Sequence, residues 1–157
     1  MAAPSGQYDP TKLINLGNNR WAFKPEVGMS HPIGRWDLDA YLGVWFFTDN
    51  TAYFPGTSNR SQDPIVATQG HVSYTFARRA WAAFDATYYV GGRSTVSGGD
   101  PSERQSNTRI GATVAVPVGR RQSIKGSFST GAATRTGTDF NTVSVLWQMA
   151  WIPTPRP

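Results

Sequence analysis

The chain has 157 residues, a length that fits a single domain able to bury a core of its own. Only 16% of the residues are charged, and the net charge of +5 comes from Lys and Arg residues scattered singly or in pairs, which argues against nucleic-acid binding. The absence of cysteine excludes disulfide frameworks and thiolate metal sites, while 16 Gly and 13% aromatic residues favour an all-β fold.

The first segment, residues 1–18, is polar and is predicted to be a long lead-in loop. It contains neither a basic nor an apolar stretch, so it does not resemble a signal peptide. No part of the chain approaches the ~20 consecutive apolar residues of a transmembrane helix. If the protein is exported, we expect its signal to have been removed or the chain to be part of a longer one.

Side-chain polarity alternates with a period of two through most of the chain, which predicts strands rather than helices. Seven antiparallel strands are predicted, over residues 19–31, 35–48, 65–77, 80–91, 104–117, 121–134 and 140–152. Each is close to or longer than the ~9–11 residues with which a tilted strand crosses a bilayer. Strands of globular proteins are mostly ~5–6 residues long, so these lengths favour membrane-spanning strands.

The connections between the predicted strands alternate in length. Short turns lie near residue 33, at 78–79 and at 118–120, and longer polar loops lie at 49–64, 92–103 and 135–139. This alternation is typical of outer-membrane barrels, whose periplasmic turns are short and whose extracellular loops are long. The Pro-rich tail at 153–157 is therefore expected in the periplasm.

Each predicted strand has one face that is apolar and free of charge along its length. The residues expected to face lipid are Phe23, Val27, Leu42, Val44, Phe46, Val72, Phe84, Ile110, Val114, Phe128, Val145 and Trp147. The residues expected to face a lumen are Arg20, Lys24, Glu26, Asp37, Asp39, Gln69, His71, Asp85, Arg109, Lys125, Arg135 and Gln148. No helical segment could cover so large an apolar surface, which would aggregate in water but match a bilayer.

Aromatic residues occur in two settings. One set gathers near the strand ends, as an interfacial girdle would, and consists of Trp21, Trp36, Tyr74, Phe76, Trp81, Trp147 and Trp151. A second set points inward in the expected register, and consists of Tyr41, Trp45, Phe47, Trp81 and Tyr89. Inward rings fit a pathway for aromatic solutes, and they fit a small barrel filled by its own side chains equally well.

Polar side chains that could carry chemistry are few. Asp37 and Asp39 share one strand face, but we expect them to solvate the lumen and to pair with Lys24 or Arg20 rather than to catalyse a reaction. His31 and His71 are too isolated to form a metal site. No nucleophile motif, phosphate loop or dinucleotide fingerprint occurs. The sequence predicts no enzyme, no cofactor and no metal.

Four stretches carry a resemblance to a known family: "NRWAFKPEVGMSHPIGRWDLDAYLGVWFFTDN", "QDPIVATQGHVSYTF", "WAAFDATYYVGGRSTVSG" and "RQSNTRIGATVAVPVGRRQSIKGSFSTGAATRTGTDFNTVSVLWQMAW". They strongly resemble the bacterial outer-membrane family named for the MetA pathway of phenol degradation, over roughly residues 4–152. The resemblance implies a transmembrane meander β-barrel in the outer membrane that passes small hydrophobic or aromatic compounds. Family members are usually longer, so we expect residues 1–157 to form one domain that is the C-terminal part of a larger barrel.

The interpretation as part of an outer-membrane barrel implies certain partners, and two other interpretations of the sequence remain open. The expected partners are membrane lipid, a small hydrophobic or aromatic solute, and missing strands supplied by upstream chain or by self-association. One alternative is a soluble, lipocalin-like ligand-binding barrel, with the apolar face turned inward around a central cavity. Another is a structural outer-membrane barrel without transport, which differs in the width of its lumen.

Overall fold

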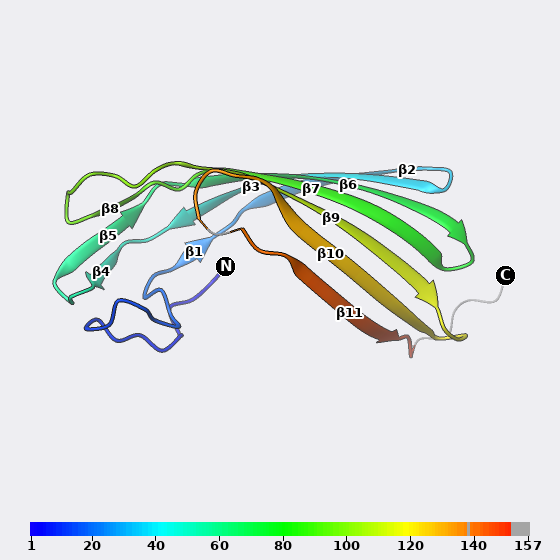
Figure 1. Cartoon of the computed structure of the whole chain (residues 1–157), viewed down its shortest axis with the longest axis horizontal. Coiled ribbons are helices and arrows are strands. Elements are labelled where there is room, and N and C mark those ends of the chain that lie inside the picture. Colours follow the sequence, from blue (N-terminus) through cyan, green and yellow to red (C-terminus); the bar gives the residue numbers. More distant parts are fainter. Residues whose placement is uncertain (138, 152–157) are drawn as a thin grey trace.

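The computed structural model describes residues 1–137 and 139–151, and in these ranges all regular structure is β. The strands are β1 (Ala22–Phe23), β2 (Glu26–Ile33), β3 (Trp36–Phe47), β4 (Asn50–Tyr53), β5 (Ser58–Gln62), β6 (Ile65–Ala77), β7 (Ala80–Gly91), β8 (Ser94–Val96), β9 (Gln105–Pro117), β10 (Gln122–Thr134) and β11 (Thr142–Met149). Figure 1 shows their arrangement. No helix in the described ranges is long and apolar enough to cross a membrane.

The long strands form one antiparallel sheet in the order β2-β3-β6-β7-β9-β10-β11, in which every neighbour along the chain is a neighbour in space. The predicted all-β meander of seven long strands is therefore confirmed. The first predicted strand, 19–31, is divided into β1 and β2. Pro25 lies at the break, where it has no N–H to donate, although its carbonyl accepts a bond of 3.1 Å from the Val44 amide.

The predicted loops 49–64 and 92–103 contain a second, small sheet of β4, β5 and β8. β5 precedes β6 and β8 follows β7, so the two extend the β6–β7 hairpin beyond the large sheet. The Asp63 amide donates to the Arg93 carbonyl at 2.8 Å where the two sheets meet. These strands were missed because they are short and polar, without the alternation that marks the long strands. The predicted tail, 153–157, lies outside the described residues.

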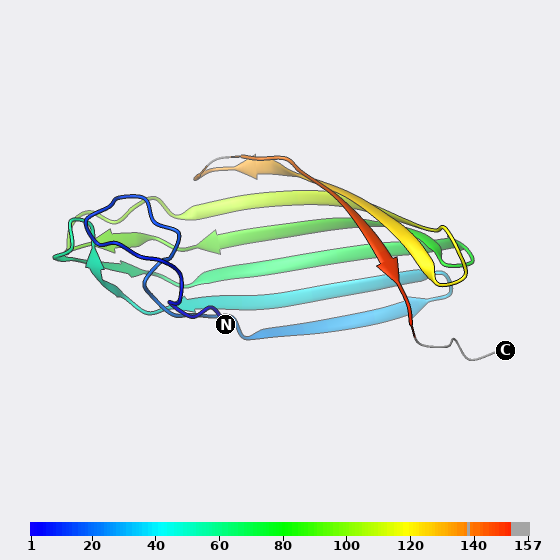
Figure 2. The ribbon, with the colours of Figure 1, turned by 90° about the horizontal axis from the view of Figure 1, so that it is seen from below.

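The large sheet is an open arch (Figures 1 and 2). Its edge strands are β2 and β11, each paired on one side among the described residues. The N-terminal segment lies under the concave side, at the end where the loops and the small sheet are found (Figure 2). Arg20 of this segment contacts the Phe47 ring, which identifies the face that carries Phe47 as the concave one.

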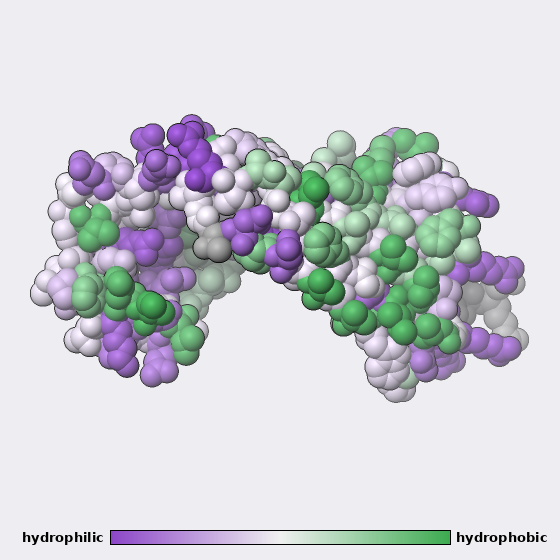
Figure 3. Space-filling model, viewed as in Figure 1, coloured by the Kyte–Doolittle hydropathy of each residue, from purple (hydrophilic) through white to green (hydrophobic). Residues whose placement is uncertain are grey.

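The two faces of the arch have opposite chemistry. Large apolar side chains are exposed on the convex face, including Val145 at 76% and Phe84 at 53%, while the buried residues Ala67, Ala83 and Ala115 are small and lie on the concave face. Apolar surface covers much of the long strands in Figure 3. A soluble lipocalin-like barrel requires the reverse, with large apolar side chains around a dry centre, so that alternative is wrong.

Candidate functional site on the concave face

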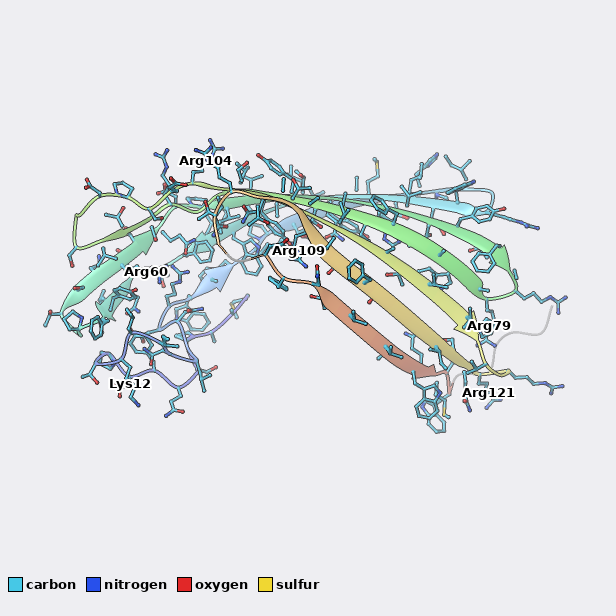
Figure 4. All side chains as sticks on the ribbon, viewed as in Figure 1. Lys12, Arg60, Arg79, Arg104, Arg109 and Arg121 are labelled. Atoms are coloured by element: carbon cyan, nitrogen blue, oxygen red, sulfur yellow. The ribbon has the colours of Figure 1, made fainter. Side chains whose placement is uncertain are left out.

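The strand register places most of the predicted lumen residues on the concave face. They are Lys24, Glu26, Asp37, Asp39, Gln69, His71, Asp85, Arg109, Lys125 and Gln148. Arg20 precedes β1 and reaches the same face, where its Nη2 donates to Gln62 Oε1 at 2.5 Å. Arg135 lies beyond the end of β10, in the loop that follows it. Arg109 is labelled under the arch in Figure 4.

A row of directly paired residues crosses the middle of this face. It runs from strand to strand through Ser30, Asp39, His71, Asp85, Gly111, Ser129 and Thr142. His71 Nδ1 lies 2.5 Å from Asp85 Oδ1, and Asp39 is opposite His71 on its other side. The predicted pairing of Asp37 and Asp39 with Lys24 or Arg20 is wrong, because Lys24 forms its ion pair with Glu26.

Small residues along the row leave space above the sheet. A cavity of about 250 Å³ lies over β7, β9, β10 and β11, with Asp85, Arg109 and Tyr89 in its lining beside Gly111 and Ser129. A cation, a carboxylate and a phenol ring therefore border one hollow on this face. Hydrogen-bonding groups of both kinds and an aromatic surface are available to a small solute there.

Aromatic rings on the concave face are held by cations. The Arg20 guanidinium lies 4.5 Å from the Phe47 ring centre, Lys24 Nζ lies 5.8 Å from that of Trp45, and Lys125 Nζ lies 5.7 Å from that of Trp81. These distances are within the ~6 Å range of cation–π attraction. The sequence predicted inward rings and inward cations but not their pairing. Arg109 has a similar partner, Phe140, at 4.1 Å; Phe140 was predicted to begin the last strand, but it lies in the loop before β11.

The position of the Tyr41 ring depends on a glycine of the neighbouring strand, β2. Its ring covers Gly28, where an added Cβ would lie 2.5 Å from Tyr41 Cδ1. Any larger residue at position 28 would lift the ring off the sheet. Tyr41 also borders a cavity of about 250 Å³ with Glu26, Asp39, Gln69 and His71. The ring is thus held flat beside the central row.

The predicted lipid-facing residues all lie on the convex face. They are Phe23, Val27, Leu42, Val44, Phe46, Val72, Phe84, Ile110, Val114, Phe128, Val145 and Trp147. Aromatic pairs occur at both ends of this face, with ring centres 4.7 Å apart for Trp36 and Tyr74 and 6.1 Å apart for Trp21 and Phe23. This is the placement of interfacial girdles.

Within residues 1–137 and 139–151, no three His, Asp or Glu residues are grouped so that they could hold a metal ion. The polar groups of the concave face are spread along the strands of the large sheet.

Comparisons with known proteins agree with this architecture. The model of the family described as "Putative MetA-pathway of phenol degradation" matches residues 1–147. The crystal structure of the COG4313 outer membrane channel from Pseudomonas putida F1 is similar with a TM-score of 0.80 at 20% sequence identity. The match covers 91% of this chain and 54% of that channel, so the chain spans about half the channel's length. No curated protein matches the chain.

Proposed function

Since the chain belongs to the family described as "Putative MetA-pathway of phenol degradation", as its sequence predicts, we propose that it forms part of the wall of an outer-membrane channel for small hydrophobic or aromatic compounds. Its location in the bacterial outer membrane follows from family and fold together. The concave face lines the lumen, and the convex face contacts lipid. The chain itself carries out no reaction; it provides a path.

The observation that carries this proposal is the set of cation-bound rings on a polar, concave face. Trp45, Phe47 and Trp81 present aromatic surface to the lumen, and Lys and Arg hold them in place. An aromatic solute gains offset or edge-to-face contacts with such rings, each worth roughly 0.5–1.5 kcal/mol beyond its buried area. Contacts this weak allow a solute both to bind and to leave, which passage requires.

The closed barrel that contains this chain, reconstituted in a planar lipid bilayer, tests the proposal, because the sheet of the chain itself is open. We expect ionic conductance, with reversible, concentration-dependent block of the current when phenol is added. Trp81→Ala should weaken the block because it removes a lumen ring. Trp147→Ala is the matched control, since it also removes one indole near the turn end but from the convex face, where the side chain is 61% exposed.

Two results would contradict the proposal. A closed barrel that contains this chain and inserts into the bilayer without conductance would be structural, with its interior filled by the paired cations and rings. A phenol block that Trp81→Ala leaves unchanged would mean that the rings do not contact the solute.

A further inference from the structure

A cavity of about 250 Å³ lies at the loop end of the molecule, between the N-terminal segment and the small sheet. Tyr8, Leu13 and Ile14 line it from the N-terminal segment, and Tyr53 and Arg60 line it from β4 and β5, together with Arg20. Figure 4 shows Arg60 on the side of the small sheet that faces the segment carrying Lys12. The cavity is separate from those over the large sheet.

The N-terminal segment is closed on itself, so its side of the cavity is preformed. The Gly17 amide donates to the Gln7 carbonyl at 2.9 Å. Gly17 also lies against Gly6, so closely that an added Cβ would be 2.6 Å from the Gly6 carbonyl oxygen. Asn15 Nδ2 donates to the carbonyls of Asp9 and Lys12, at 3.0 and 2.9 Å. These bonds give a compact loop whose ends meet.

Asn50 fixes this loop to the small sheet. The side chain is 3% exposed, and its Nδ2 donates to Tyr8 Oη at 2.9 Å. Its Oδ1 accepts from Asn19 Nδ2 at 2.9 Å and from the Ala52 amide at 3.1 Å. All the hydrogen-bonding groups of this amide except one donor are thus used within the protein, and the charged residues among those that line the cavity are Arg20 and Arg60.

Arg20 and Arg60 both face the cavity without an anionic partner. Neither forms an ion pair with any residue in the ranges that the structure describes. Arg20 Nη1 is buried and has no hydrogen-bond acceptor there. Burial, and then the charge of Arg60, lower the pKa of Arg20 below its usual value. Two like charges beside each other are unfavourable, and an anion bound in the cavity would relieve their repulsion.

Beside the polar side chains of Asn15 and Asn18, the lining has an apolar part formed by Leu13, Ile14 and the Tyr53 ring. Leu13 and Ile14 are 65% and 88% exposed at the rim, and the Tyr53 ring lies 5.2 Å below the Arg60 guanidinium. The volume is below the ~300–1,000 Å³ of pockets for drug-sized ligands, so the ligand must be smaller. We propose that the cavity binds a small organic carboxylate, with its carboxylate between Arg20 and Arg60 and its apolar body against Leu13, Ile14 and Tyr53. Guanidinium groups hold carboxylates through paired N–H bonds.

Calorimetric titration of the full chain in detergent micelles with benzoate tests this site. Benzyl alcohol, which has the ring without the charge, and acetate, which has the charge without the ring, should both bind at least about tenfold more weakly. Arg60→Gln should weaken benzoate binding by a similar factor, and Arg60→Lys should weaken it less. Arg121→Gln is the control, because it removes the same charge from the opposite end of the molecule (Figure 4).

The site is overturned if benzoate does not bind, if benzyl alcohol binds as well as benzoate, or if Arg60→Gln and Arg121→Gln have equal effects. The comparison of benzoate with benzyl alcohol and acetate uses the unchanged chain, so it tests the proposed site even if Arg60→Gln does not fold. Binding at this site and passage of phenol are measured separately. Loss of the benzoate site would leave the conductance result intact, and an absent conductance would leave the benzoate result intact.

Discussion

Val72 and Gln69 lie on the same strand, β6, and both are exposed, but they belong to opposite faces of the arch. We expect Val72→Arg to lower the free energy of unfolding by about 2–4 kcal/mol, because it places a charge among lipid chains near the middle of a strand. Gln69→Arg should change it little, since water and polar groups surround that position. Urea titration of the chain folded in phospholipid vesicles gives both values. Equal losses would show that the convex face does not contact lipid.

For single residues, the sequence predicts which face of the sheet a side chain lies on better than it predicts which residue of the neighbouring strand lies opposite. Alternation alone places Asp39 and His71 on one face, because the side-chain period of a strand is two. Partners also depend on register, and a shift of two residues keeps the face while it changes every pair. For this reason the sequence placed Asp39 correctly on the polar face but paired it with Lys24 or Arg20, whereas it lies opposite His71.

At the scale of elements, the small sheet of β4, β5 and β8 is held by hydrogen bonds around the buried side chain of Asn50 rather than by apolar packing. The sequence could not predict it, because segments such as Ser58–Gln62 are polar throughout. The long strands were predictable, because a bilayer requires an uninterrupted apolar face over their length. A feature built from individual hydrogen bonds leaves a much weaker pattern than one built from burial.

Asn50 provides a test at this scale. Asn50→Ala removes bonds to Tyr8, Asn19 and Ala52, and a lost buried bond costs roughly 1–3 kcal/mol. We expect faster amide hydrogen exchange in β5 and β8 and unchanged exchange in β7. Asn59→Ala is the control, since Asn59 is exposed and its side chain bonds Asp49 in the same region. Equal exchange in the two variants would contradict this role of Asn50.

At the scale of the whole molecule, stability differs between the centre and the edges of the arch. β7 has partners on both sides, whereas β2 and β11 have a partner on one side in the part of the chain described. In micelles, we expect amides on the free side of β2 to exchange faster than those of β7. Slow exchange throughout β2 would mean that a further strand, such as one from a second copy, covers this edge.

The meander also restricts how the arch can become a closed ring. β2 and β11 both run from the loop end toward the turn end, because six reversals separate them. Contact between these two edges, within one chain or between two copies inserted from the same side of the membrane, would join them as parallel neighbours. An antiparallel seam between two copies would require one of them to be upside down. Closure with antiparallel seams throughout therefore takes an odd number of added strands, which also gives the even total of bacterial single-chain barrels.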